Sequence, residues 1–488
     1  MKINPQLVRF AGLLLALCPG AAFAQTAASP PGSSPPGSSP PESNTSPSAP
    51  SASRAPATGA KSIAVPVISE ATGARPLVSG PLSLAQAVES ALANSPRLRG
   101  AQADLDIAIA QVGAARAARQ PSVSATTFLT GGGENGPIYN SPDGVTPQNL
   151  FAVPRGAFAN QNVMFLLPLF NGGRLGALTR QAEATRGASQ ADLQTTRLDV
   201  VLETKTAYRQ VLLALELQKV AVGRQKATEE RLKNDRAALE AGRVPQLYVL
   251  RDEAEDADAQ QETVNAARDV ELALVMLRAV MGVQSDSPVT LSDSLETTGT
   301  EVLDANPVQM ALLARPEVQG ARSRLESARR GADAARGTSR PQAALMGMAD
   351  ANRGRGGSAA GASVGLIIGV PLFDGGARRA AREEAGANIA KAQADLDRLE
   401  IQVEREVRSA QLSLEAAQKS VAATQLGIAA AQEAGRVAAL RYESGRATNA
   451  ETLDALAALT RAQGNLARAR FDVQSARDAL QRALGASP

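Results

Sequence analysis

Apolar residues recur every seven positions along a proline-free segment, residues 174–240. A seven-residue period predicts α-helices that pair with a left-handed twist. Two such series run side by side, which predicts a helix with neighbours on two sides. At about 1.5 Å per residue, this helix would be about 100 Å long. The two series are Val201, Tyr208, Leu215 and Val222, and Val200, Ala207, Ala214 and Ala221.

Four shorter segments are predicted to be β-strands, and the last of them has the alternation of side chains that is typical of a strand. In the clearest one, one face is more apolar than the other, because Val364, Leu366, Ile368 and Val370 alternate with Gly365, Ile367 and Gly369. A strand that crosses a membrane needs about 9–11 residues, and these segments have suitable lengths. The predicted strands are residues 121–130, 160–170, 341–350 and 361–373.

The sequence is duplicated. PLFNGG at residues 168–173 recurs as PLFDGG at 371–376, and Gly242-Arg243 recurs as Gly445-Arg446, both 203 positions later. Before the strands the offset is 220, so the first copy is 17 residues longer, within the Gly- and Pro-rich segment 131–150. A constant offset over more than 110 residues indicates paired helices of fixed length. Each copy predicts a helix, two strands, a long helix, a tight turn and a returning helix.

The N-terminus has the pattern of a secretory signal peptide at residues 1–24, with Lys2 and Arg9, a short apolar run and an Ala-Phe-Ala cleavage pattern. The only cysteine, Cys18, lies within it. A lipid anchor on Cys18 is the alternative, although Leu17 is not the small residue such sites have. Residues 25–80 are rich in Pro and Ser and predict a disordered periplasmic tail. The predicted organisation then continues as a first repeat (81–282), a linker (283–306) and a second repeat (307–488).

The composition excludes several classes of chemistry. The chain has no His and no Trp, and its formal charge is +3, with Lys and Arg scattered among Asp and Glu. We therefore predict no catalytic residues, no cofactor, no metal site and no nucleic-acid partner. No mature segment has 18 consecutive apolar residues, so a membrane crossing would require a β-barrel.

Several motifs together resemble the TolC-type family of outer-membrane efflux proteins. They are the segment from Leu82 (LSLAQAVESALANSPRLRGAQADL), the doubled PLF[ND]GG, the AGR and SGR turns, and the Leu-x-x-x-x-Gly endings at Leu277 and Leu480. The resemblance covers about residues 81–485. It implies an α+β fold that is mainly α, with duplicated long-helix hairpins forming an α-barrel and four transmembrane strands per chain. It also implies a location in the outer membrane of a Gram-negative bacterium, in contact with its lipid and with the helices in the periplasm.

The number of chains follows partly from physical reasoning. Four strands cannot close a barrel, for which about eight is the minimum, and an open sheet edge in lipid leaves backbone groups unpaired. Two chains would give 8 strands and three would give 12. The resemblance favours a homotrimer with a 12-stranded barrel, and it implies a periplasmic adaptor and an inner-membrane transporter as partners.

Candidate site residues lie at bends and turns. Glycine pairs at the ends of the predicted strands permit a strand-to-helix bend, and the two glycine–arginine turns either dock the adaptor or simply end and cap the helices. The resemblance places Asp454, and less directly Glu451, in a periplasmic gate that would form a negative ring. The alternative for Glu451 is a Thr-x-x-Glu capping box with Thr448. The bend residues are Gly172, Gly173, Gly375 and Gly376; the turn residues are Gly242, Arg243, Gly445 and Arg446.

We therefore expect an outer-membrane exit duct of a tripartite efflux system, without enzymatic activity. The alternatives are the duct of a type I protein secretion system and a periplasmic coiled-coil scaffold. The four predicted strands argue against the scaffold. The exported substrate is not specified by these residues.

Overall fold

The computed structural model describes residues 76–77, 80–132, 156–295, 306–354 and 357–485. The predicted signal peptide, nearly all of the predicted tail and most of the segment 131–150 lie outside the described residues.

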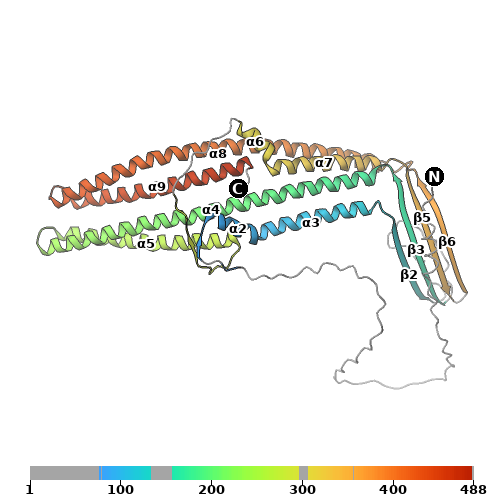
Figure 1. Ribbon diagram of the computed structural model, residues 1–488, viewed down its shortest axis with the longest axis horizontal. Helices are drawn as coiled ribbons and strands as arrows, with labels where there is room; N and C mark the ends of the chain where they lie inside the picture. The colour runs from blue at the N-terminus through green and yellow to red at the C-terminus, as the bar shows by residue number, and fades with distance from the viewer. Residues whose placement is uncertain (1–75, 78–79, 133–155, 296–305, 355–356, 486–488) are drawn as a thin grey trace, which may run out of the picture. The chain divides into compact units, whose positions relative to one another are not determined.

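Each half of the described chain contains two helices, an antiparallel strand pair and a long helical hairpin (Figure 1). In the first half these are α2 (Leu84–Asn94), α3 (Pro96–Ala117), β2 (Ser122–Gly132), β3 (Gly156–Asn171), α4 (Arg174–Glu240) and α5 (Gln246–Met281). In the second half they are α6 (Pro307–Ala314), α7 (Pro316–Gly337), β5 (Gln342–Gly354), β6 (Gly357–Gly369), α8 (Ala377–Glu443) and α9 (Asn449–Leu484). This confirms the predicted fold of duplicated long-helix hairpins with four strands. Closure of the sheet between chains stays a prediction.

The two hairpins have equal lengths. α4 and α8 each have 67 residues, and α5 and α9 each have 36. The proline-free segment predicted as one helix is α4, with the same bounds. In Figure 1, α5 lies beside one part of α4 and α9 lies beside one part of α8, and the helices of each pair are in contact.

The first helix of each repeat is divided in two, where the sequence predicted one. α2 ends before Ser95-Pro96, and α6 ends before Arg315-Pro316. Ser95 and Arg315 have extended backbones, because the residue before a proline is disfavoured in the helical region. Each proline then begins the next helix, where its missing N–H costs nothing.

The sheet order is β2-β3-β5-β6, so the two repeats meet between β3 and β5 (Figure 1). All three pairings are antiparallel, and they include Ser122 with Leu166, Phe165 with Gly347, and Met346 with Gly365. A second sheet of two short parallel strands, β1 (Gly80–Leu82) and β4 (Val289–Leu291), was not predicted. It joins the start of the first repeat to the segment after α5.

The predicted bounds of the last strand were wrong. β6 spans Gly357–Gly369 rather than 361–373. Pro371 cannot donate to a strand ladder, and β6 pairs only with β5 in the described sheet. Its counterpart Pro168 lies within β3, where pairing with β5 continues through a bulge between Pro168 and Phe170.

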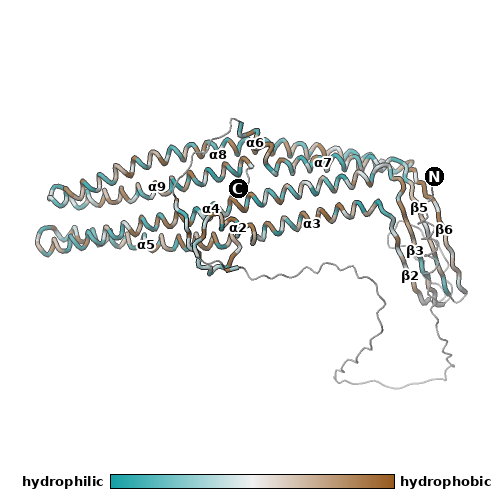
Figure 2. Tube along the Cα trace, viewed as in Figure 1, coloured by the Kyte–Doolittle hydropathy of each residue, from teal (hydrophilic) through white to brown (hydrophobic). Residues whose placement is uncertain are grey.

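The helical core centres on α4, which packs against α3, α5, α7 and α9. Both seven-residue series of the sequence lie at these contacts: Val201 and Tyr208 are buried, as are Val200 and Ala214. Figure 2 shows polar and apolar residues mixed along every helix. Among the described helices, none combines the length and the apolar character that a bilayer crossing requires.

Candidate functional site

The two hairpin turns have the same backbone geometry. Gly242 and Gly445 have φ of +68° and +70°, a left-handed conformation that favours glycine. The N–H of Arg243 donates to the carbonyl oxygen of Ala238 at 2.8 Å, and that of Arg446 to the carbonyl oxygen of Arg441 at 2.7 Å. All four predicted turn residues, Gly242, Arg243, Gly445 and Arg446, are exposed.

Glu451 and Asp454 follow the second turn, on the first turns of α9. Glu451 forms the capping box with Thr448 and lies 3.7 Å from Arg441, as an ion pair between exposed side chains. Asp454 is exposed and makes no hydrogen bond or ion pair with the described residues. Glu451 therefore has a structural task, whereas nothing within the described chain accounts for Asp454. Pro245 is the N-cap of α5.

A group of buried and half-buried polar side chains, the inter-hairpin cluster, lies close to the turns: Arg231, Asp235, Asp252, Tyr442 and Asn449. Asp235 and Asp252 are 3% and 1% exposed, and Asn449 is fully buried. The Tyr442 hydroxyl donates to Asp235 Oδ2 at 2.8 Å, and Asn449 Nδ2 donates to Asp235 Oδ2 at 3.2 Å and to Asp252 Oδ1 at 2.9 Å. Arg231 Nε lies 3.3 Å from Asp252 Oδ1, and its guanidinium stacks 4.7 Å from the centre of the Tyr442 ring.

This cluster draws one or two residues from each of four helices. Arg231 and Asp235 belong to α4 and Asp252 to α5, while Tyr442 belongs to α8 and Asn449 to α9. Both carboxylates are therefore in the first hairpin, and the Tyr442 and Asn449 donors are in the second. The cluster can form only where the two hairpins are in contact.

Burial raises the pKa of two groups in this cluster, Asp252 and Tyr442. It raises the pKa of Asp252 to about 6, with a further increase from Asp235, against decreases from the Asn449 hydrogen bond and the Arg231 charge. Burial and the hydrogen bond to Asp235 raise the pKa of Tyr442, which therefore stays a hydroxyl donor at any ordinary pH.

The sequence analysis missed these residues because they have no counterpart in the other repeat. At the offset of 203, Asp235 corresponds to Ala438, Asp252 to Ala455 and Tyr442 to Leu239. A signal was nevertheless present. The buried seven-residue series that begins at Val200 continues to Thr228 and Asp235, so a carboxylate occupies a position that should be apolar.

The predicted bend residues lie between the strands and the long helices. Gly172 and Gly173 have φ of +61° and +85°, and Gly375 and Gly376 have φ of +66° and +95°. Their surroundings differ: a Cβ on Gly172 would lie 2.6 Å from the carbonyl oxygen of Gly337, whereas a Cβ on Gly375 would meet nothing within 4 Å.

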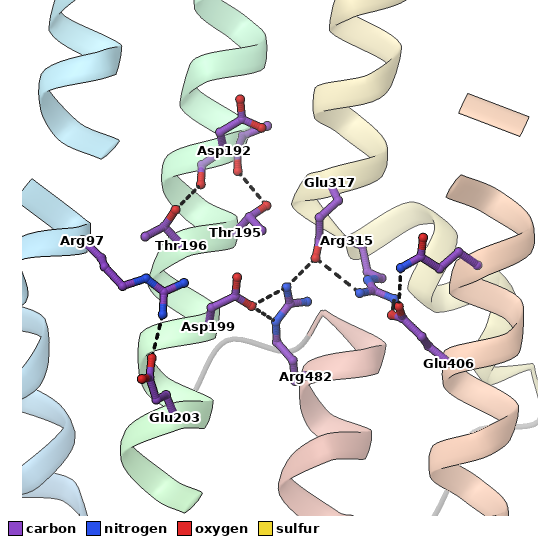
Figure 3. A network of polar contacts seen from close by, with 12 residues as sticks. Arg97, Asp192, Thr195, Thr196, Asp199, Glu203, Arg315, Glu317, Glu406 and Arg482 are labelled. Carbon is purple, nitrogen blue, oxygen red and sulfur yellow. Dashed lines mark hydrogen bonds and ion pairs between the residues drawn. The ribbon is translucent and has the colours of Figure 1, made fainter. Parts of the chain in front are cut away.

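A second polar group, the mid-chain cluster, joins α9 to the starts and middles of other helices (Figure 3): Asp199, Arg315, Glu317, Glu406 and Arg482. Arg482 bonds to Glu317 at 2.5 Å and to Asp199 at 2.9 Å, and Arg315 bonds to Glu406 at 2.7 Å. Burial alone would raise the pKa of Glu317, but hydrogen bonding to Arg482 and the charges of Arg482 and Arg315 hold it below its usual value. Two arginines and three carboxylates make this a charge-paired junction between the repeats.

Neither cluster has the composition of a metal site. Within the part of the chain that the structure describes, no group of three or more His, Cys, Asp or Glu side chains could hold a metal ion.

The comparison with protein-family models identifies one family. The model of the "Outer membrane efflux protein" family matches residues 87–283 and 308–486. The chain is 29% identical to Protein CyaE of Bordetella pertussis over 355 residues, which are 68% of this chain and 69% of that protein. It is 24% identical to the outer membrane protein TolC of Escherichia coli over 416 residues, 80% of this chain and 79% of TolC. The crystal structure of the outer membrane protein VceC from Vibrio cholerae superposes with a TM-score of 0.69, at 22% identity, over 83% of this chain and 96% of VceC.

Proposed function

The chain belongs to the outer membrane efflux protein family, and on that premise we propose that three copies form the passive exit duct of a tripartite export system. The protein is located in the outer membrane, with its long helices in the periplasm. In this proposal the four strands of each chain join into one closed 12-stranded sheet, which leaves no unpaired edge in lipid. A periplasmic adaptor docks at the exposed turns, and an inner-membrane transporter supplies the substrate and the energy. The duct itself performs no chemistry.

The observation that carries the proposal is the position of Asp454. It is an exposed carboxylate near the start of α9 that makes no hydrogen bond or ion pair with the described residues, and the chain belongs to a family of outer membrane efflux proteins. Three copies related by a three-fold axis would bring three such carboxylates around one axis. A ring of carboxylates at a constriction favours cations and binds multivalent cations more tightly than monovalent ones. Glu451, which caps its helix, contributes less to this ring.

The test is single-channel conductance of the purified mature protein in planar bilayers. The wild type should form cation-selective pores that a trivalent cation blocks, and Asp454→Ala should lose most of the block and part of the selectivity. Asp472→Ala is the matched control, because Asp472 is an exposed carboxylate on the same helix, 18 residues further on. Eighteen residues are five helical turns, so Asp472 lies on the same face about 27 Å away.

Two results would contradict parts of this account. Pores with equal block in the wild type and in Asp454→Ala would keep the duct and remove Asp454 from the gate. A folded protein that never inserts into the bilayer would contradict the duct itself.

A further inference from the structure

The inter-hairpin cluster contains fewer donors than its buried acceptors need. Asn449 Nδ2 serves both carboxylates, at 3.2 Å from Asp235 and 2.9 Å from Asp252. Two oxygens in the cluster, Asp252 Oδ2 and Asn449 Oδ1, are buried and have no hydrogen-bond partner among the residues that the structure describes. Buried acceptors without donors cost free energy. One additional proton on Asp252 Oδ2 would turn one of these two unpaired acceptors into a donor.

The charges in the cluster lead to the same conclusion. The groups that face Asp252 are Arg231 and Asp235 from α4, Tyr442 from α8 and Asn449 from α9. With both carboxyls ionised, two buried negative charges face a single positive one. A proton on one carboxyl makes the cluster neutral, and two close carboxyls commonly share a proton for this reason.

We propose that the inter-hairpin cluster is a proton-dependent latch: a proton on the Asp252 carboxyl, at the contact with Asp235, Tyr442 and Asn449, keeps the two hairpins joined, and its loss loosens them. The proposal rests on the duct function, since joined hairpins would correspond to a narrowed periplasmic end. It makes acidity of the periplasm a signal that narrows the duct.

The direction of the pH dependence follows from the difference in the pKa of Asp252 between joined and separated hairpins. In the joined state burial raises the pKa of Asp252 to about 6, whereas a carboxyl released into water titrates near about 3.9. The joined state therefore binds more protons between these values. The stability that the proton gives to the joined state is fully present below the pKa of the released carboxyl. It declines as the pH rises through the pKa of the buried carboxyl, and no more is lost at higher pH. Within the window, each pH unit shifts the ratio of joined to separated hairpins by up to about tenfold per chain.

Nearby charges outside the cluster do not explain such a response. Asp256, one turn further along α5, accepts hydrogen bonds from Thr228 and Gln260, both of the first hairpin. The Arg441–Glu451 pair is exposed. Asp256 is therefore a matched control: it is a buried aspartate on the same helix, but all of its described partners belong to one hairpin.

The test measures the separation of the hairpins directly. Spin labels on Glu240→Cys and Glu443→Cys, in a Cys18→Ala background, would report the distance between α4 and α8 by pulsed electron resonance. Both positions are exposed and lie at the last residue of their helices. The distances in the wild type should be larger at pH 8 than at pH 5. Asp252→Asn, which is neutral at every pH, should give the same distribution at both, while Asp256→Asn should respond like the wild type.

The proposal is overturned if the wild-type distribution does not change between pH 5 and pH 8, or if Asp252→Asn changes as much as the wild type. Asp235→Asn neutralises the other carboxyl and provides a second test if Asp252→Asn does not fold. The distance measurement does not require conduction. If the protein forms pores but the distance does not depend on pH, the latch is refuted and the duct is kept. If the distance depends on pH but the protein forms no pores, the duct is refuted and the latch is kept.

Discussion

The long helices of the two repeats have equal length but different surroundings. One side of each helix is buried in the same way, since Val200 and Val403 are 2% and 0% exposed. The other side differs: Leu198 in α4 is 8% exposed, and its counterpart Ile401 in α8 is 70% exposed. α4 has α3, α5, α7 and α9 as neighbours, whereas α8 packs mainly against α7 and α9. Both long helices thus have two faces that can pack against other helices. Within one chain, both faces are buried in α4, whereas only one is buried in α8.

The duplicated contacts indicate what would cover α8. In the chain, α7 packs on α4 with Thr185 Oγ1 3.0 Å from Ser327 Oγ. A Cβ on Gly187 would lie 3.8 Å from the Cβ of Ser323. The corresponding residues are Asn388 and Ala390 of α8 and Ile107 and Ala103 of α3, and all four are exposed. We infer that α8 of one chain packs on α3 of the next as α4 packs on α7, which makes a head-to-tail ring.

The largest expected effect is at the strand-to-helix bends. Gly172→Ala should destabilise the folded chain by about 3 kcal/mol or more, because it combines a left-handed backbone with a Cβ 2.6 Å from a carbonyl oxygen. In dissociated chains, Gly375→Ala should lower the free energy of unfolding by about 1–2 kcal/mol, because only the left-handed backbone conformation opposes the substitution. Thermal unfolding of both variants measures the difference, and equal losses would contradict the asymmetry.

Next in size is the loss of the Tyr442 hydroxyl. Tyr442→Phe leaves the buried Asp235 with fewer donors, which should weaken the contact between hairpins by about 1–3 kcal/mol and increase single-channel conductance. Tyr248→Phe is the control in the first repeat, because the Tyr248 side chain makes no hydrogen bond within the described residues. A Tyr442→Phe pore with wild-type conductance would show that the contact does not limit the opening.

The two polar clusters should respond to acid in opposite directions. The pKa of Glu317 is held below its usual value, so its contribution to stability is present above the ordinary carboxyl pKa, about 4.3, and is lost as the pH falls below it. The thermal midpoint of unfolding should therefore decrease from pH 5 to pH 3, and Glu317→Gln should reduce this decrease. The inter-hairpin contact should instead strengthen from pH 7 to pH 5.

The smallest effect concerns one place where the repeats are not equivalent. Arg324 of α7 pairs with Asp192 of α4 at 2.5 Å, but the counterparts are both acidic: Asp104 of α3 and Asp395 of α8. If these two face each other between chains, Asp104→Arg should stabilise the assembly by about 0.2–1 kcal/mol. The midpoint of trimer dissociation in detergent measures this. A lower midpoint would place the two aspartates apart.

Much of the fold could be predicted from the sequence because its signals are local. The bounds of α4 follow from the glycines that flank it at the bend and at the turn, and from the proline-free segment with a seven-residue period between them. The turns and the capping box of Thr448 and Glu451 follow from a few adjacent residues. The end of the last strand was misplaced because pairing with a neighbour, and not the residues 361–373 alone, decides where β6 stops.

The buried cluster could not be predicted in the same way. Asp235 and Asn449 are more than 200 positions apart, and their contact depends on which helices become neighbours. Comparison of the two repeats gives no signal for the two carboxylates, since both have alanine at the corresponding position. The gate roles of Asp454 and Glu451 and the adaptor roles of the turns stay predictions, because they depend on other chains.

Cross-linking between copies of the chain tests the central claim most directly. Ala103→Cys and Ala390→Cys in one Cys18→Ala chain should lie at a Cβ separation of about 3.8 Å across the interface, which suits a disulfide. Oxidation should give a covalent trimer in a denaturing gel, while either cysteine alone should give monomer. A double variant that remains monomeric, stops at a dimer or forms a ladder of larger species would contradict a closed ring of three chains.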